Sequence, residues 1–447
     1  MADCIDPTAG ASPSRRDFLK SSSIAMAAAG LTGSLGALPK AHAAGKDLLK
    51  VALIGCGGRG TGAIAQALKT EGNVQLVALA DAFENNLQNT LKSLQKEFAN
   101  RPDRIAVTPE HCFVGFDAYQ KVLATDVDVV VLATSPGFRP IHFEAAVKAG
   151  KHVFMEKPVA VDGAGVRQVL AAAEVAKAKN LCVGVGLQRH HDYGYMETIK
   201  RVQDGAIGDI LSARVYWNSN GVWVRPRKPG QTEMEYQMRN WYYFTWLSGD
   251  HIVEQHIHNI DVINWMKGDY PISAQGVGGR EVRRGKEYGE IYDHHAVEFE
   301  YKDGSRMFSV CRHMSNTAPN ISEHAQGSKG TVDLDDRQTA QIRVRGQEIW
   351  NYGKKRNAAF QDEHHHLFAA IRSGTPYNEA EYGAKSSMTA ILGRLATYSG
   401  EVVTFDAALN SPVTLAPREY SFQAEPRVLP GPDGIYPAAV PGVTKVV

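Results

Sequence analysis

Short apolar runs alternate with helix-like segments along the first half of the chain. The runs 49–54, 74–80 and 127–133 are rich in apolar and β-branched residues, as is typical of strands buried on both faces of a sheet. The segment 61–69 between the first two runs has apolar residues at helical spacing. Repetition of strand and helix in this order predicts a doubly wound parallel sheet, a Rossmann domain, over residues 48–187.

The pattern changes after about residue 188. The runs 212–217 and 296–301 alternate apolar and polar residues, which is typical of antiparallel strands with one covered face. We therefore expect an α+β second domain over residues 188–380. Residues after about 400 are rich in proline, and we expect them to pass over the surface. The predicted fold class is α/β for the first domain and α+β for the second.

Composition excludes several classes of protein. With 447 residues, 43% hydrophobic and 22% charged, the chain is typical of globular proteins. The 49 Lys and Arg residues are balanced by 48 Asp and Glu residues, so no charge excess favours nucleic acid or an anionic membrane. No apolar run reaches the roughly 18 residues of a membrane-spanning helix. The 5 cysteines show no CxxC spacing and do not indicate a disulfide framework.

The N-terminus has the order of a secretory signal. Arg15 and Arg16 precede a weakly apolar stretch, 24–38, and the triplet 41–43 (Ala-His-Ala) offers a cleavage site. Paired arginines indicate the twin-arginine export route, so we expect residues 1–43 to be a signal peptide and the mature protein to be periplasmic. An amphipathic helix is the alternative, but three glycines in the stretch disfavour it.

A glycine-rich loop follows the first apolar run and has the sequence Gly55-Cys56-Gly57-Gly58-Arg59-Gly60. Gly55 would permit the tight turn, Gly57 would let the backbone approach a pyrophosphate, and Gly60 would let the helix pack on the strand. The free N–H groups of the next helix would bind the phosphates. Strand, glycines, helix and strand in this order predict a dinucleotide-binding loop.

The second strand ends at Asp81, which can accept hydrogen bonds from an adenosine ribose. No Lys or Arg occurs in the next five residues, so a 2′-phosphate would meet an acid and no base. The cofactor expected is therefore NAD rather than NADP.

Polar residues follow two later strands of the same domain. Thr134 and Pro136 follow one, and Glu156 and Lys157 follow the other. Ligands of doubly wound sheets bind beyond the carboxyl ends of the strands, so we expect these residues at the binding site. The alternative is that Lys157 is an ordinary surface lysine in a loop. The proline that follows it stiffens the turn, which favours a defined position of the lysine at the binding site.

The segment 248–268 carries the candidate proton chemistry. Helix-start residues at 248–250 and a glycine at 268 predict one continuous helix. Glu254, His258 and Asp261 would then form a polar stripe at i, i+4 and i+7. A carboxylate one turn before a histidine can orient its ring and raise its basicity, as a general base requires. An exposed polar face is the alternative interpretation.

A metal site is a further interpretation of this segment, with Glu254, His256, His258 and Asp261 as ligands. Because His256 and His258 would lie on opposing faces of a helix, we expect no metal. The histidines at 190–191 and 364–366 are expected on loop and helix surfaces. The aromatic residues at 241–246 are either core or a wall that stacks on a sugar, and core is the expectation for most of them.

These motifs resemble the glucose–fructose oxidoreductase / inositol dehydrogenase (Gfo/Idh/MocA) family over nearly all of the chain after residue 43. The resemblance is carried by the glycine loop, residues 134–142, Glu156-Lys157-Pro158, and His258-Asn259-Ile260-Asp261 with Trp265. It implies a large, mostly antiparallel open sheet in the second domain, commonly used for oligomer contacts, so we expect a homo-oligomer. Residues 375–405 look like the family's C-terminal helix and return strand, which places that helix, the strand and the tail in 381–447.

The resemblance also implies roles for residues. Lys157 would hydrogen-bond the reacting hydroxyl, and His258 would move the proton. Glu254 stands where the family often has Asp. The expected NAD contacts are Gly55, Gly57, Gly58, Arg59, Gly60, Asp81, Thr134, Pro136, His142, Glu156 and Lys157. The expected substrate contacts are Arg189, His256 and Asp261.

The reaction expected is hydride transfer from a sugar, polyol or glycoside hydroxyl carbon to tightly bound NAD. No free NAD pool is expected outside the cytoplasm, so the cofactor would be recycled in place. An NAD-dependent glycoside hydrolase is one alternative, but the Thr-His-Gly-type segment of those relatives is absent. A non-catalytic periplasmic sugar-binding protein is another, and the intact Lys157 and His258 argue against it. Residues 417–447 or 44–50 could cover the cleft and retain NAD.

Overall fold

The structure is a computed structural model that describes residues 47–337, 339–354 and 357–447. The predicted signal peptide, residues 1–43, lies outside the described residues. Within the described part, no helix combines the length and the apolar character needed to cross a bilayer.

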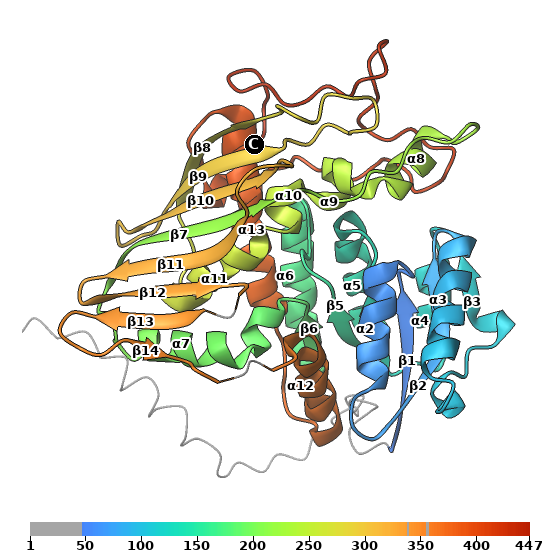
Figure 1. Ribbon diagram of the computed structural model, residues 1–447. Helices are drawn as coiled ribbons and strands as arrows, with labels where there is room; N and C mark the ends of the chain where they lie inside the picture. Colours follow the sequence, from blue (N-terminus) through green and yellow to red (C-terminus); the bar gives the residue numbers. More distant parts are fainter. Residues whose placement is uncertain (1–46, 338, 355–356) are drawn as a thin grey trace, which may run out of the picture. The chain divides into compact units, whose positions relative to one another are not determined.

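The first domain contains a six-stranded parallel sheet with the order β3-β2-β1-β4-β5-β6 (Figure 1). Every neighbouring pair is parallel, which confirms the predicted doubly wound sheet. The strands are β1 (Leu48–Ile54), β2 (Asn73–Asp81), β3 (Cys112–Val114), β4 (Val129–Leu132), β5 (His152–Met155) and β6 (Val183–Val185). Residues of β4 and β5 are buried throughout because helices cover both faces of the sheet.

The two faces of this sheet are covered by different helices. Leu49, Val51 and Leu53 of β1 share a core with residues of α2 (Gly58–Leu68), α3 (Glu84–Glu97) and α12 (Ala359–Ser373). The alternating Ala52 and Ile54 pack in a second core with residues of three other helices. Those helices are α4 (Ala118–Leu123), α5 (Arg139–Lys148) and α6 (Gly163–Ala178). Although α12 falls within the range predicted for the second domain, it packs on the first.

The second domain contains a nine-stranded sheet with the order β14-β13-β12-β11-β7-β10-β9-β8-β15. Its strands are β7 (Ile210–Ser219), β8 (Ser273–Gly279), β9 (His294–Glu300), β10 (Arg306–His313), β11 (Asn320–Gly327), β12 (Gly330–Asp335), β13 (Ala340–Val344), β14 (Trp350–Asn351) and β15 (Val403–Thr404). Neighbours are antiparallel except for the parallel pair β7 and β10, so the predicted mostly antiparallel sheet is confirmed.

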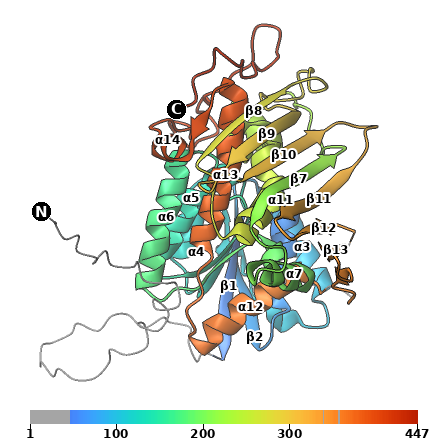
Figure 2. The ribbon, with the colours of Figure 1, turned by 90° about the vertical axis from the view of Figure 1, so that its left-hand side faces the viewer.

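One face of this large sheet is covered by helices. The longest, α13 (Ala380–Ser399), contacts β8 and β9 on one side and α6 on the other, so it is buried almost all round (Figure 2). Further helices on this face are α7 (Tyr193–Gln203) and α11 (Ile257–Lys267). The opposite face exposes apolar side chains, among them Val277 and Phe308.

The remaining short helices connect the two domains and the C-terminus. They are α8 (Glu233–Arg239), α9 (Thr245–Ser248), α10 (His251–Glu254) and α14 (Phe405–Asn410). Short 3-10 helices are η2 (Pro102–Arg104), η3 (Pro109–His111), η4 (Pro136–Phe138), η5 (Gln188–His191) and η6 (Trp241–Tyr243). After α14, residues 411–447 contain no helix or strand, and we call this segment the C-terminal strap.

Candidate active site

The glycine loop is held tightly on one side and is open on the other. Gly55 has φ +103°, and a Cβ there would lie 2.4 Å from the Thr134 amide nitrogen. A Cβ on Gly60 would lie 1.9 Å from the Gly55 carbonyl oxygen. By contrast, a Cβ on Gly57 or Gly58 would meet no atom within 4 Å. Free N–H groups at the start of α2 therefore face open space, which fits the pyrophosphate of a dinucleotide.

A cleft extends from this loop along the carboxyl ends of the strands. Its walls include Gly55, Gly57, Asp81, Thr134, His142 and Trp241. Burial, with the charge of Arg139, lowers the pKa of His142 to about 3, so its ring is neutral near pH 7. Its Nδ1 lies 3.3 Å from the Thr134 hydroxyl oxygen. Pro136 is buried at the start of η4 and does not line this cleft.

The carboxylate of Asp81 lines the cleft but already has protein partners. Its Oδ2 accepts from the Cys56 amide at 2.7 Å, and its Oδ1 accepts from the amide of Phe83 at 2.8 Å. Burial raises the pKa of Asp81 despite these bonds. An ionised carboxylate offers about four lone-pair directions, so Oδ2 can accept one more bond from a ribose hydroxyl.

Sequence reasoning missed a base near this position. The Arg239 guanidinium lies 3.9 Å from the ring centroid of Phe83, and its charge acts to lower the pKa of Asp81. Arg239 also pairs with Glu235 one helical turn earlier. No local signal could reveal it, because α8 belongs to the other half of the chain.

Arg59 ties the glycine loop to two carboxylates. It forms ion pairs with Glu156 and, at 3.1 Å, with Glu363 of α12. Burial and the nearby charge of Glu156 raise the pKa of Glu363 well above its usual range. Both predicted cofactor contacts, Arg59 and Glu156, thus direct their side chains to protein partners, and the network fixes the loop beside Lys157.

Lys157 is held by Glu254. Its Nζ donates to the Glu254 carboxylate at 2.9 Å and to the Glu254 backbone carbonyl at 2.5 Å. The two side chains are 12% and 13% exposed, so the pair is mostly buried. The prediction that Glu254 orients His258 is therefore wrong: its carboxylate positions the lysine.

The predicted continuous helix over 248–268 is interrupted, which explains this difference. Helix α10 ends at Glu254, α11 begins at Ile257, and Gln255 and His256 form a turn between them. In that turn the His256 amide donates to the carbonyl of His251, five residues earlier. This wider turn means that His258 does not lie one α-helical turn above Glu254 on a shared helix face. The predicted end at Gly268 is confirmed, with φ +65°.

His258 has the properties of a neutral proton acceptor. It is 7% exposed, and its ring stacks on Trp217 with centroids 6.0 Å apart. Burial, followed by the charges of Lys157 and Arg189, lowers its pKa well below the ordinary value. Among the described residues, its Nδ1 has no hydrogen-bond partner.

Two of the three predicted substrate contacts lie in the protein interior. His256 is fully buried, and its Nε2 lies 2.8 Å from the Ser309 hydroxyl. Asp261 is 2% exposed; it accepts from the Ser386 hydroxyl at 2.7 Å and pairs with His190 at 2.8 Å. Neither can contact a substrate in this structure, so both predictions are wrong. The interrupted helix turns both side chains towards the core.

Arg189, the third predicted contact, is also mostly buried. It forms an ion pair with Glu323, which further accepts from Asn259 and from the Tyr195 hydroxyl at 2.9 Å. Asn259 is the neighbour of His258, so this network supports α11 from behind the site.

The histidines that were expected on the surface are largely internal. His190 stacks between Trp265 and Tyr382, with centroids 4.1 and 4.3 Å away. His364 is fully buried against Phe154. The surface prediction is wrong for His191 and His364, which are buried, and segments distant in sequence also cover His190. His365 and His366 are half-buried. In the aromatic stretch, residues 242–246 are buried as expected, whereas Trp241 lines the cleft.

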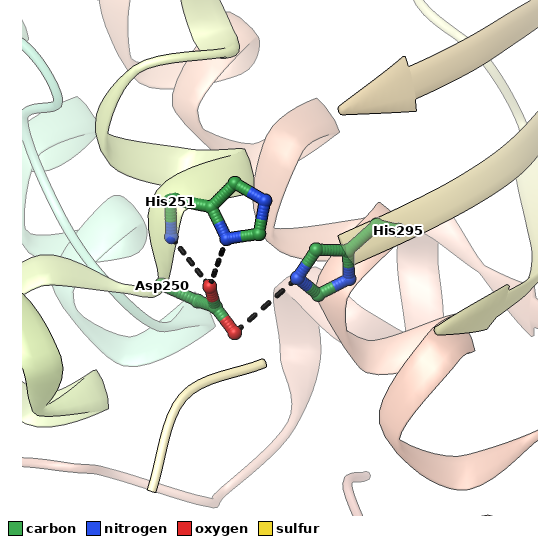
Figure 3. Close-up of side chains that lie close together, drawn as sticks. All are labelled: Asp250, His251 and His295. Atoms are coloured by element: carbon green, nitrogen blue, oxygen red, sulfur yellow. Dashed lines mark hydrogen bonds and ion pairs between the residues drawn. The ribbon is translucent and has the colours of Figure 1, made fainter. Parts of the chain in front are cut away.

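A buried polar cluster sits at the start of α10 (Figure 3). Asp250 Oδ1 accepts from the His251 amide and from His251 Nδ1 at 2.8 Å. Its Oδ2 accepts from the Tyr398 hydroxyl at 2.6 Å and lies 3.3 Å from His295 Nε2. Burial would raise the pKa of Asp250, but the neighbouring histidines outweigh it and hold the pKa well below its usual range.

This cluster acts on backbone geometry. Asp250 has φ +77°, a conformation that non-glycine residues rarely adopt and that costs on the order of 1–3 kcal/mol. The cluster holds this turn, and the turn aims α10, with Glu254 at its end, at Lys157. Asp250, His251 and His295 are close enough to ligate a metal, but protein donors already occupy the carboxylate oxygens. We therefore interpret these three residues as a hydrogen-bonded cluster that stabilises the turn at Asp250.

Two family models match this chain. Residues 49–187 match the family model described as "Oxidoreductase family, NAD-binding Rossmann fold", and residues 195–333 match the "GFO/IDH/MocA C-terminal domain". An inositol 2-dehydrogenase of Pseudomonas syringae pv. syringae is 27% identical over 382 residues, which cover 83% of this chain and 98% of the relative.

Solved structures share the fold. A Caulobacter crescentus aldose-aldose oxidoreductase, complexed with glycerol, superimposes with a TM-score of 0.62 at 20% identity. A levoglucosan dehydrogenase complexed with NADH and levoglucosan superimposes with a TM-score of 0.63 at 17% identity. Each superposition covers 80% of this chain and 99% of the other.

Proposed function

Because the chain belongs to the Gfo/Idh/MocA family of oxidoreductases, we propose that it oxidises a secondary hydroxyl of a sugar, polyol or glycoside. NAD, the family cofactor, supplies the hydride acceptor. The observation that carries the proposal is the pairing of Lys157 with Glu254, with a neutral His258 close enough that the charge of Lys157 helps burial to lower its pKa. Inositol 2-dehydrogenase and levoglucosan dehydrogenase act on substrates of this polyhydroxylated class, as their names state.

Two residues divide the chemistry of the hydroxyl. The Lys157 ammonium has three N–H donors, and two are engaged by Glu254, so one remains for the reacting oxygen. It would stabilise the negative charge that develops on that oxygen. The neutral imidazole of His258 would accept the hydroxyl proton. Its depressed pKa keeps it unprotonated near pH 7, as this step requires.

Glu254 would act as a positioning residue. Its carboxylate and backbone carbonyl both accept from Lys157, which fixes the ammonium at one place and balances its charge. The buried Tyr242 hydroxyl lies near enough to Glu254 that this carboxylate helps to raise the tyrosine pKa. The glycine loop would bind the pyrophosphate, with Asp81 on the ribose.

We further propose that the protein is exported to the periplasm by the twin-arginine route and keeps its NAD bound. Export is supported by Arg15, Arg16 and the stretch that follows them. Retention is supported by the C-terminal strap. Its Phe422 packs on Phe83 and Phe116, with centroids 5.4 and 4.9 Å away, and its Tyr420 packs on Phe138 at 5.4 Å. Phe83, Phe116 and Phe138 all line the cleft, so the strap packs against the residues that form one wall.

Association of copies through the large sheet is the third element of the proposal. Val277, Phe308 and Val402 are 72%, 43% and 65% exposed and lie around one shallow groove on the open face. Exposed apolar side chains grouped in this way favour a protein contact.

An absorbance scan with a panel of sugars, polyols and glycosides tests the function. A rise in the reduced-nicotinamide band upon mixing supports the dehydrogenase. Release of free sugar without net reduction would instead support a glycoside hydrolase that oxidises transiently. Binding without either change would overturn enzymatic function.

The retention proposal has a separate test. The purified protein is dialysed and denatured, and the supernatant is assayed for NAD. One NAD per chain supports retention, and an otherwise identical variant truncated after residue 416 should lose it. A site emptied by dialysis, with activity restored by added NAD, would overturn retention but leave the proposed reaction intact.

A further inference from the structure

A second pocket lies between α13 and the C-terminal strap, away from the nucleotide cleft. It has a volume of about 300 Å³, which lies at the lower end of the usual range for small-molecule sites. Ile391, Arg394 and Leu395 of α13 form its base. Two passes of the strap, 411–415 and 437–446, contribute the opposite wall. We call it the strap pocket.

Arg394 is the unusual feature of this pocket. It is only 3% exposed, and among the described residues its one side-chain hydrogen bond runs from Nη1 to the Gly249 carbonyl at 3.0 Å. Its Cζ lies 6.0 Å from the ring centroid of Tyr398. No carboxylate of the described residues forms an ion pair with it. Buried arginines are ordinarily paired, because an unpaired charge in an apolar setting is costly. Burial accordingly lowers the pKa of Arg394.

The charges of Asp250, Asp162 and Glu290 act to raise the pKa of Arg394, but none of these acids forms an ion pair with it. Asp162 is engaged as the N-cap of α6, accepting from the Gly165 amide at 2.7 Å, and it also accepts from the Leu415 amide at 2.7 Å. Glu290 directs Oε1 to the amide and hydroxyl of Thr245, while its buried Oε2 has no partner among the described residues. Burial raises the pKa of Glu290.

We propose that the strap pocket binds a small organic carboxylate, with its carboxylate on Arg394 and its apolar body against Ile391, Leu395 and Leu415. The guanidinium fork matches a carboxylate, and four of its five N–H groups are uncommitted to protein partners. Lys445, exposed at the pocket on the strap side, adds a second positive charge. The apolar walls favour a hydrocarbon body over a bare inorganic anion.

A ligand bound in the strap pocket would also stabilise the C-terminal strap in its present position. The bonds between the strap wall and the rest of the protein include Tyr292 Oη to the Ala439 carbonyl at 2.9 Å, the Gly442 amide to the Ser399 carbonyl at 2.7 Å, and the Leu415 amide to Asp162 at 2.7 Å. A ligand between Arg394 and the strap would add contacts on both sides. Hydrogen exchange in 411–415 and 437–446 should therefore slow when the ligand is bound.

Calorimetric titration of the full-length, NAD-loaded protein tests the proposal, with benzoate and isobutyrate as probes. Benzoate should bind, and neutral benzyl alcohol of similar shape should bind at least tenfold more weakly. Arg394→Gln should weaken benzoate at least tenfold. Arg284→Gln, which removes a 68%-exposed surface arginine, is the matched control and should change nothing.

A second variant keeps the test decisive if Arg394→Gln fails to fold. Ala438→Phe fills the pocket from the strap side and leaves Arg394 in place, so it should also abolish benzoate binding. Equal benzoate affinity in either folded variant, or no binding of either carboxylate at 50-fold excess over millimolar protein, would overturn the proposal. None of these readouts depends on sugar oxidation, so failure here leaves the proposed function untouched.

Discussion

The nucleotide side and the proton side of the site are built in different ways. The glycine loop is one contiguous stretch, 55–60, and its shape follows from close backbone contacts at Gly55 and Gly60. The proton side joins Lys157, at the end of β5, to Glu254, which lies 97 residues further along. Its geometry depends on a turn at Asp250 and on a helix interruption at 255–256.

This difference shows where a spacing argument is reliable. In the loop, the positive φ of Gly55 and the close approach of Gly60 to the Gly55 carbonyl are constraints within the loop itself, although Gly55 also packs against Thr134. On the proton side, the same i, i+4 argument assumed one continuous helix and failed when the helix broke. The sequence assigns Glu254 to His258, whereas in the structure its carboxylate pairs with Lys157.

The largest effect should come from Lys157→Ala. Loss of the ammonium removes the charge that stabilises the developing alkoxide, so kcat should fall about 1,000-fold. NAD content should remain that of the parent, because the pyrophosphate site lies on the glycine loop. Absorbance kinetics measure the rate of the reaction, and the NAD assay measures the cofactor content. Turnover close to that of the parent would show that Lys157 does not stabilise the developing alkoxide.

His258→Ala should be the next largest change, with a loss of about 100-fold or more as expected for a general base. The parent gives a sharper test through pH. Because the pKa of His258 lies well below 6.5, the imidazole should stay neutral as pH falls through that value. The rate should therefore remain flat past pH 6.5 and decline only in more acid solution. A parental rate that halves near pH 6.5 would contradict the buried, neutral base.

The assignment of Glu254 is tested by a matched pair of isosteric variants. Glu254→Gln leaves the backbone carbonyl on Lys157 but removes the charge, and kcat should fall by about tenfold. Asp261→Asn weakens the bonds to Ser386 and His190 and should lower the free energy of unfolding by about 1–3 kcal/mol. Its kcat should be unchanged. If Asp261→Asn instead lowers kcat and Glu254→Gln does not, the result would support the predicted polar stripe on one continuous helix.

The smallest effect is expected on the nucleotide side, at Asp81. Asp81→Ala removes a ribose acceptor and a negative charge, so NAD should bind several-fold more weakly and discrimination against NADP should relax. The charge of Arg239 acts on Asp81, so it would attract a 2′-phosphate once the Asp81 charge is gone. The double variant Asp81→Ala, Arg239→Gln should again reject NADP. Unchanged NADP rejection in the single variant would mean that another residue reads the ribose.

The sequence by itself determined the elements whose causes are local. Buried β-branched runs such as the one in β4 predicted the parallel sheet, and the glycine loop predicted the dinucleotide site. The end of α11 at Gly268 also followed from the sequence, because a glycine can adopt the left-handed conformation found there.

The tertiary structure decided what each polar group faces. Whether His256 and Asp261 point to substrate or core, which residue holds Lys157, and where Arg239 lies were all fixed by packing between distant segments. Asp250 shows the reason most clearly. Its unfavourable φ of +77° is stabilised by His251, His295 and Tyr398, and two of these come from other elements far along the chain. The local backbone preference of an aspartate disfavours this positive φ. The turn is stable because the assembled cluster of hydrogen bonds holds it.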